Sequence, residues 1–98
     1  MSEYKKMFDM MMEQHKELFD NFMDIHHEYA LNPAKWQKLF NQYGSEVTDV
    51  VRDYERKLCI KMGAGKYGKF SQNLSEKFWN EVRKTFPKID FVGVVIEQ

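Results

Sequence analysis

The chain of 98 residues has one cysteine, two prolines and no long apolar run. A single cysteine cannot form an intramolecular disulfide, so the sequence favours a reducing compartment. No wholly apolar run is longer than Val94-Val95-Ile96, whereas a membrane-spanning helix needs about 20 such residues. The opening residues carry no apolar core of a signal peptide. We therefore expect a cytoplasmic domain that does not contact a membrane.

Charge of one sign is not in excess over the whole chain, because 15 Lys and Arg balance 15 Asp and Glu. The balance is uneven along the sequence. Residues 1–31 hold three lysines and seven carboxylates, a net charge of −4, and residues 61–88 hold seven cations and two glutamates, a net charge of +5. Such asymmetry indicates either an anionic partner for the basic part or packing of the acidic segment against the basic one. The zero total favours packing within the chain.

Two stretches carry apolar residues at spacings of three and four, which is typical of amphipathic helices. They cover residues 3–30 and 33–61. Asn32 suits a helix N-cap and Pro33 a first helical position, so the connection is short and predicts an antiparallel helical hairpin. Around Gly44 we expect a continuous or kinked helix rather than a clean break. The seam is the line of residues along which the two predicted helices face each other. It consists of Tyr4, Phe8, Met11, His15, Leu18, Phe22, Ile25 and Tyr29 in the first helix, and of Trp36, Phe40, Tyr43, Val47, Val50, Tyr54 and Leu58 in the second.

A glycine-rich connection follows, in which Gly63 is expected to take the left-handed conformation that closes the second helix. A third helix is predicted over residues 72–86 and is stopped by Pro87. Its predicted inner stripe consists of Leu74, Phe78, Val82 and Phe86. Residues 89–96 are β-like in composition but have no evident partner strand. They either lie extended along the helices, pair with the glycine-rich loop or pair with another chain. The predicted fold is a mainly α single domain over residues 1–98, an antiparallel helical bundle with a short C-terminal extended segment.

The glycine-rich connection carries the sharpest motif, because residues 63–71 nearly match the phosphate-binding loop G-x-x-x-x-G-K-[ST]. Phe70 stands where the Mg²⁺-binding hydroxyl belongs, and no βαβ unit surrounds the motif, so we reject nucleotide hydrolysis. Glycine N–H groups, lysines and a following helix N-terminus still suit an anion, although a flexible soluble connection explains the same residues. The candidates for anion or nucleic-acid binding are Lys61, Gly63, Gly65, Lys66, Tyr67, Gly68, Lys69, Arg83 and Lys84.

Residues with acid, base or nucleophilic chemistry form no recognisable active site. His26 and His27 lie near the end of the first helix, but Asp24 and His27 make only an echo of the Glu-x-x-His motif of di-iron bundles, so no metal or other cofactor is expected. His15 occupies a seam position, where a hydrogen-bonded structural histidine is the simplest interpretation and pH sensitivity the alternative. Cys59 has no histidine nearby in the predicted register, so we expect no catalytic residue and no enzyme.

Three helices of unequal length cannot fully cover the long hairpin, and an uncovered apolar surface is typical of a contact site. We therefore expect a non-enzymatic protein-binding or assembly module whose partner is another protein chain, most simply a second copy in a dimer. The alternative is a nucleic-acid or phosphate-ligand binding protein that uses the basic residues 61–88. The predicted interaction surface consists of Phe8, Met11, Leu58, Phe91 and Val94.

Overall fold

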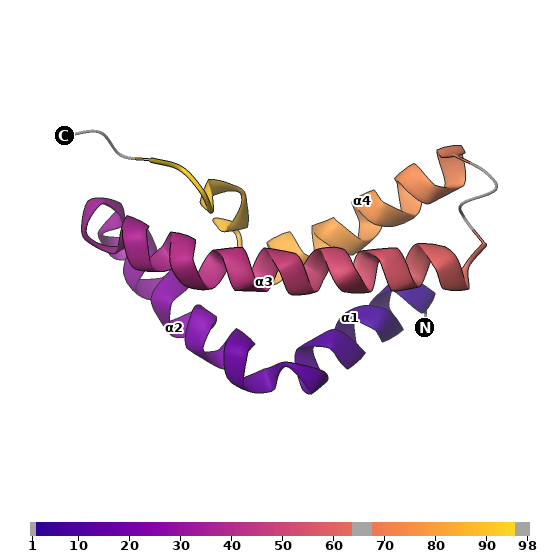
Figure 1. The fold of residues 1–98 in the computed structure, drawn as a ribbon, viewed down its shortest axis with the longest axis horizontal. Helices are drawn as coiled ribbons and strands as arrows, with labels where there is room; N and C mark the ends of the chain where they lie inside the picture. Colours follow the sequence, from indigo (N-terminus) through magenta and orange to yellow (C-terminus); the bar gives the residue numbers. More distant parts are fainter. Residues whose placement is uncertain (1, 64–67, 96–98) are drawn as a thin grey trace.

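The computed structural model describes residues 2–63 and 68–95, and in this part of the chain four α-helices pack together without any strand. The elements are α1 (Glu3–Gln14), α2 (Lys16–Leu31), α3 (Pro33–Lys61), α4 (Gly68–Thr85) and the 3₁₀ turn η2 (Ile89–Phe91). In Figure 1, α3 forms a long horizontal axis, α1 and α2 form an open V beside it, and α4 crosses it at an angle. The prediction of a mainly helical bundle is confirmed.

The helix α3 runs without a break through Gly44, as the uninterrupted apolar pattern predicts. Its start follows the sequence signals, since Asn32 Oδ1 accepts the Lys35 N–H at 3.3 Å and Pro33 occupies the first turn. At 1.5 Å per residue, its 29 residues span about 43 Å. This length makes α3 the element against which α1, α2 and α4 all pack.

The prediction of one helix over residues 3–30 is wrong, because the chain bends at His15 between α1 and α2. His15 has φ −122° and ψ 36°, outside the helical region. The bend lets α1 contact both α3 and α4, while α2 contacts mainly α3. At the bend, the His15 ring lies 5.6 Å from the Tyr54 ring, and the Tyr54 hydroxyl donates to Gln14 Oε1. These tertiary contacts leave no signal in a local spacing pattern, so the sequence shows no break there.

The third predicted helix exists as α4, which begins at Gly68 instead of residue 72 and ends at Thr85, one residue before the predicted end. Pro87 stands two residues after Thr85, and Gly63 has the expected positive φ of 65°. The predicted inner stripe of the third helix is confirmed, because all four of its residues are buried, the last of them directly after the end of α4. They are Leu74, Phe78, Val82 and Phe86.

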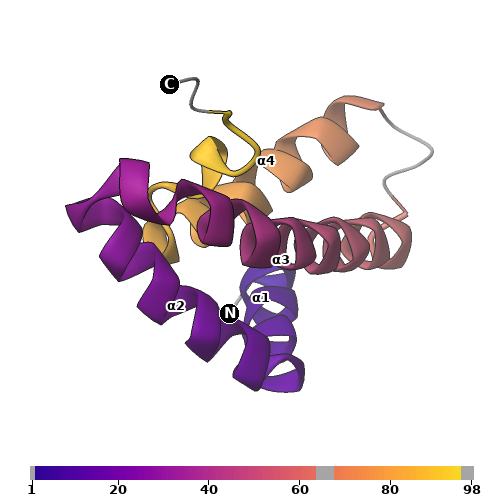
Figure 2. The same cartoon turned by 60° about the vertical axis from the view of Figure 1, so that its left-hand side comes forward.

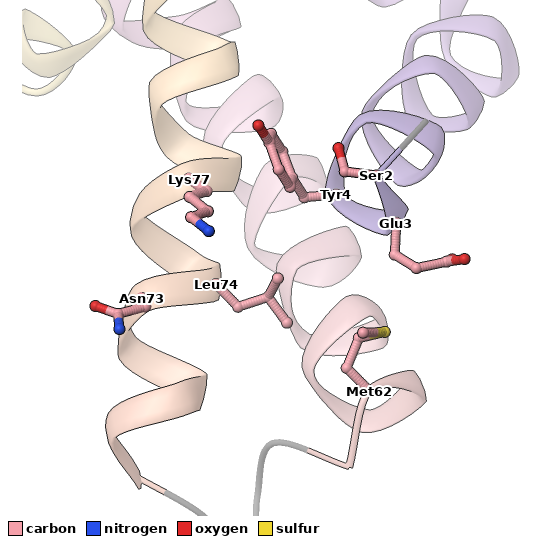
Figure 3. A pocket seen from close by; sticks show the side chains of 7 residues that line it. All are labelled: Ser2, Glu3, Tyr4, Met62, Asn73, Leu74 and Lys77. Atoms are coloured by element: carbon pink, nitrogen blue, oxygen red, sulfur yellow. The ribbon is translucent and has the colours of Figure 1, made fainter.

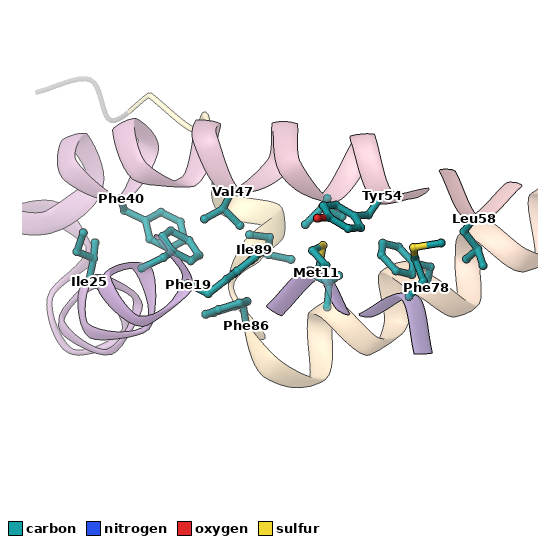
Figure 4. Close-up of a cluster of buried hydrophobic side chains, with 14 of the residues drawn as sticks. Met11, Phe19, Ile25, Phe40, Val47, Tyr54, Leu58, Phe78, Phe86 and Ile89 are labelled. Carbon is teal, nitrogen blue, oxygen red and sulfur yellow. The ribbon is translucent and has the colours of Figure 1, made fainter. Parts of the chain in front are cut away.

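The core lies between α3 and the other helices and is rich in aromatic side chains (Figure 4). Phe86 is its aromatic hub, with ring centroids 5.0 Å from Phe22, 6.0 Å from Phe19 and 5.7 Å from His26. Through these contacts, the residue that directly follows α4 packs against α2. The buried apolar residues are Met7, Met11, Phe19, Phe22, Ile25, Tyr29, Phe40, Val47, Val51, Tyr54, Leu58, Leu74, Phe78, Val82, Phe86 and Ile89.

The predicted β-like segment over residues 89–96 is not a strand in the part that the structure describes. Residues 89–91 form η2, residues 92–95 follow as turn and coil, and Ile96 lies outside the described residues. Figures 1 and 2 place this segment beside the N-terminal half of α3, on the opposite side from α2. Side chains of the helices bond its backbone, so it needs no partner strand.

Candidate functional site

Residues 88–95, here called the C-terminal segment, are held by polar side chains of α3. Asn41 Oδ1 accepts the Gly93 N–H at 2.8 Å, and Asn41 Nδ2 donates to the Val94 carbonyl at 2.8 Å. Gln37 Nε2 donates to the Phe91 carbonyl at 3.2 Å. Backbone groups that a strand would pair with a neighbouring strand are thus bonded by two amide side chains one helical turn apart.

A buried hydrogen-bond network orients these amides. The Tyr29 hydroxyl of α2 donates to Gln37 Oε1 at 2.8 Å, and Gln37 Nε2 also donates to Asn41 Oδ1 at 2.8 Å. Gln37 is only 5% exposed, so its polar atoms need these partners. The network therefore connects α2 through α3 to the C-terminal segment.

Gly44 makes room for the same segment. A Cβ atom at Gly44 would stand 2.5 and 2.8 Å from the two methyl carbons of Val92 and 3.2 Å from its Cβ. The sequence allowed a kink in α3 at Gly44. In the structure, the missing side chain of this glycine instead leaves space for Val92 of the C-terminal segment. Gln37, Asn41 and Gly44 lie at positions i, i+4 and i+7, so they share one face of α3.

His26 of α2 holds the beginning of the segment. Its Nε2 accepts the Lys88 N–H at 3.0 Å, and its side chain is buried with the residue 7% exposed. The rings of Phe22, Phe40 and Phe86 surround it at centroid distances of 6.1, 5.9 and 5.7 Å. Burial, followed by the charges of Lys88 and His27, lowers the pKa of His26 below its ordinary value of 6.5. The imidazole is therefore neutral at pH 7 and acts as a hydrogen-bond acceptor.

The clamped segment exposes apolar side chains to solvent. Phe91, Val94 and Val95 are 48%, 42% and 79% exposed. Phe91 also lines a shallow cavity of about 220 Å³ together with Tyr29, Ala30, Pro33 and Lys88. We call Phe91, Val94, Val95, Ala30 and Pro33 the C-terminal patch. It combines a fixed backbone with accessible apolar groups.

Asn41→Ala is expected to raise the hydrogen-exchange rate of the Gly93 amide about tenfold or more. The substitution removes two side-chain bonds to the segment, each contributing about 0.5–1.5 kcal/mol. Exchange measured by NMR on the folded protein checks this. Gln42→Ala, an exposed neighbour on α3, is the matched control and should leave Gly93 protected. Equal exchange in both variants would contradict the role given to Asn41.

Three residues of the predicted interaction surface lie elsewhere. Met11 and Leu58 have no exposed surface, and half-buried Phe8 packs edge-on against Phe78 of α4 at 6.5 Å. The expectation that they form an uncovered end of the seam is wrong, because α4 covers that end. Phe91 and Val94, the other two, are exposed and belong to the C-terminal patch.

Three of the basic candidates pair with carboxylates. Lys61 lies 3.1 Å from Glu3 and lowers the pKa of that carboxyl by hydrogen bonding and charge, Arg83 lies 3.0 Å from Asp90, and Lys84 lies 3.2 Å from Glu81. The structure thus joins α3 to the acidic start of α1 and α4 to the C-terminal segment. The other candidates belong to the glycine-rich connection. Gly63 follows α3, Gly68 and Lys69 begin α4, and Gly65, Lys66 and Tyr67 lie outside the described residues.

A second cavity of about 240 Å³ lies where α1, α3 and α4 meet (Figure 3). Leu74 and Met62 provide apolar walls, and Tyr4 and Lys77 stand beside them. Its volume is below the range of about 300–1,000 Å³ typical of ligand pockets. It is lined by Ser2, Glu3, Tyr4, Met62, Asn73, Leu74 and Lys77.

Residues 2–63 and 68–95 bear on metal binding and on membrane crossing. No three His, Cys, Asp or Glu side chains in this part of the chain converge in a way that would hold a metal ion. None of the helices described there has the length and apolar character to cross a bilayer. Cys59 Sγ lies 3.6 Å from Ser75 Oγ, between α3 and α4.

Over the described residues, the protein belongs to the all-α class, and its C-terminal segment is hydrogen-bonded to α3. Comparison of the chain with protein-family models, curated proteins and solved structures finds no match. Function is therefore inferred from the contacts of the chain's own residues.

Sequence reasoning missed Gln37, Asn41 and Val92 and gave Gly44 and His26 other roles. One signal was present. Gln37, Asn41 and Gly44 follow one another at positions i, i+4 and i+7, beside the apolar stripe of α3. Since glycine has no side chain, another backbone can approach closely at such a place.

Proposed function

We propose that this chain is a non-enzymatic protein-binding module that associates with a second copy of itself through the C-terminal patch. The observation that carries this proposal is that Phe91, Val94 and Val95 are exposed on a backbone held by Asn41 and Gln37. Exposed apolar side chains that lie together mark interaction sites. A backbone that is already ordered loses less entropy on binding than a free tail does.

Charge favours a second copy as the partner. The formal net charge is zero, so two copies meet no net electrostatic repulsion. In a two-fold symmetric dimer the same patch faces itself, and an apolar patch is self-complementary without needing opposite charges. The exposed charged groups around the patch would form the polar rim of the interface.

The test is the mass in solution, measured by light scattering from about 1 to 500 µM at pH 7.5. The wild-type mass is expected to rise from that of one chain toward twice that value. The double variant Val94→Asp and Val95→Asp should stay monomeric, because two charges would be buried without partners. Ile60→Asp is the matched control, since Ile60 is 72% exposed near the other end of α3, and it should behave as wild type. A strictly monomeric wild type would remove the proposal.

Binding of nucleic acid or a phosphate ligand by residues 61–88 has less support. Lys61, Arg83 and Lys84 each have a carboxylate within 3.2 Å, so a phosphate would compete with an existing partner. Trp79, which would stack on a base, instead donates from Nε1 to Glu55 at 2.8 Å and is half-buried between α3 and α4. These contacts favour the C-terminal patch as the site of function.

A further inference from the structure

We propose that His26 is a pH-sensitive latch, so that proton uptake at its Nε2 releases the C-terminal segment from the helices. The proposal rests on the proposed function only in its consequence, because release would dismantle the C-terminal patch and weaken association. The latch itself concerns contacts within one chain and is testable without a partner.

The geometry allows only the neutral ring. Nε2 accepts the Lys88 N–H at 3.0 Å, so the single proton of the neutral imidazole is on Nδ1. A protonated imidazole has N–H donors at both nitrogens and no acceptor. Its Nε2–H would point at the Lys88 N–H, and two donors repel. The bond that begins the C-terminal segment therefore cannot exist with the charged form of His26.

The surroundings of the ring offer no compensation for a positive charge. The rings of Phe22 on α2, Phe40 on α3 and Phe86 after α4 enclose it and carry no charge. The titratable groups that act on it electrostatically are Lys88 of the C-terminal segment and His27 on α2, and neither is an anion. The segment contributes the Lys88 N–H to this site, so its departure removes both the repulsion between two N–H donors and the nearby Lys88 charge.

The segment is suited to leave without unfolding the helices. Apart from Ile89 and Val92, its apolar side chains are exposed. Its bonds to the helices are the His26, Gln37 and Asn41 contacts and the exposed Arg83–Asp90 ion pair, which contributes little. Losing one of these bonds weakens the attachment of the whole segment, whereas α3 keeps its own backbone bonds.

The direction of the pH dependence follows from linkage. With the segment closed, burial and the charge of Lys88 lower the pKa of His26, and its proton would also displace the Lys88 N–H. With the segment open, the Lys88 contribution and the clash between donors are gone, so the pKa rises toward its ordinary value of 6.5. The open form thus takes up the proton first. The closed segment has its full stability above pH 6.5 and loses it as the pH falls below 6.5 toward the lowered pKa. Each pH unit in this range favours the open form by up to about tenfold.

The experiment measures amide protection factors by NMR hydrogen exchange on the whole chain at pH 7.5 and 5.0, corrected for intrinsic exchange. Protection of Lys88, Gly93 and Val94 in the wild type is expected to fall by up to about thirtyfold at pH 5.0, and that of Val51 in α3 to fall much less. His26→Gln, whose side-chain oxygen accepts a bond but does not titrate, should show no such loss. His27→Gln, an exposed neighbour, is the matched control and should still lose protection at pH 5.0, because it keeps His26.

The outcomes separate the latch from the proposed function. Unchanged protection in the wild type at pH 5.0, or an equal loss in His26→Gln, overturns the latch. Should His26→Gln prove poorly folded, the wild-type and His27→Gln pair still decides, because loss of pH dependence in His27→Gln would assign the titration to His27 and overturn the proposal. Association is read separately from the mass at pH 7.5, where the segment is closed. A monomer that opens at pH 5.0 would thus end the proposed function and leave the latch standing.

Discussion

Phe86→Ala is expected to lower the free energy of unfolding by about 3–5 kcal/mol, the usual effect of emptying a buried aromatic site. Phe86 has no exposed surface and packs on Phe19, Phe22 and His26. The cavity cannot collapse easily, because those residues belong to α2 and Phe86 belongs to the turn after α4. Domains of this size have stabilities of about 5–15 kcal/mol, so this is a large part of the total.

Urea unfolding followed by circular dichroism checks the expectation. Phe91→Ala is the matched control, because it makes the same change at a side chain that is 48% exposed, and its effect should stay near or below about 1 kcal/mol. Phe86→Leu keeps most of the volume and should lose clearly less than Phe86→Ala, which keeps the series measurable if the alanine variant unfolds. Equal effects at positions 86 and 91 would contradict the place of Phe86 in the core.

Gly44→Ala is expected to destabilise the protein by about 1–3 kcal/mol, against the ordinary trend for a helix interior. In an unobstructed helix, this change stabilises by about 0.5–1 kcal/mol. Here the new Cβ would meet both methyl groups of Val92 at 2.5 and 2.8 Å and its Cβ at 3.2 Å. No rotation of a valine side chain clears all three contacts, so the C-terminal segment must shift and stretch its bonds to Asn41.

A double-mutant cycle with Val92→Ala measures this effect. Val92→Ala removes the two methyl groups, so Gly44→Ala in that background should be neutral or stabilising, and the coupling free energy should reach about 1–3 kcal/mol. Ser45→Ala, an exposed neighbour in α3, is the control for helix propensity alone. A Gly44→Ala variant that is stabilised equally in both backgrounds would show that the Val92 side chain does not pack against Gly44.

Gly44, Asn41 and His26 are three parts of one attachment that holds the C-terminal segment to the helices. Gly44 provides space, Asn41 bonds the backbone of the segment, and His26 makes its bond only in the neutral form. Under the proposed function, this attachment holds Phe91, Val94 and Val95 in place for binding a second copy. Weakening any of the three parts should therefore weaken association even though none of the three residues belongs to the C-terminal patch.

Local patterns were sufficient for most of the helices. The spacing of apolar residues located α3 and α4, and Asn32, Pro33 and Pro87 marked boundaries within a residue or two. These features depend on side chains within about one helical turn of each other, and such interactions are written directly in the sequence. The stripe of α4 is buried as expected for the same reason.

The bend at His15 and the clamp on the C-terminal segment were decided by tertiary structure alone. The bend brings α1 against both α3 and α4, and the heptad pattern is equally compatible with a straight helix. The β-like composition of residues 89–95 expresses a preference that side-chain bonds from Gln37, Asn41 and His26 override. Asn41 and Gly93 are 52 residues apart, so no local propensity registers their contact. The sequence by itself determined that α3 and most of α4 are helical and which of their faces are apolar, and packing in three dimensions determined where the chain bends and what holds its C-terminal segment.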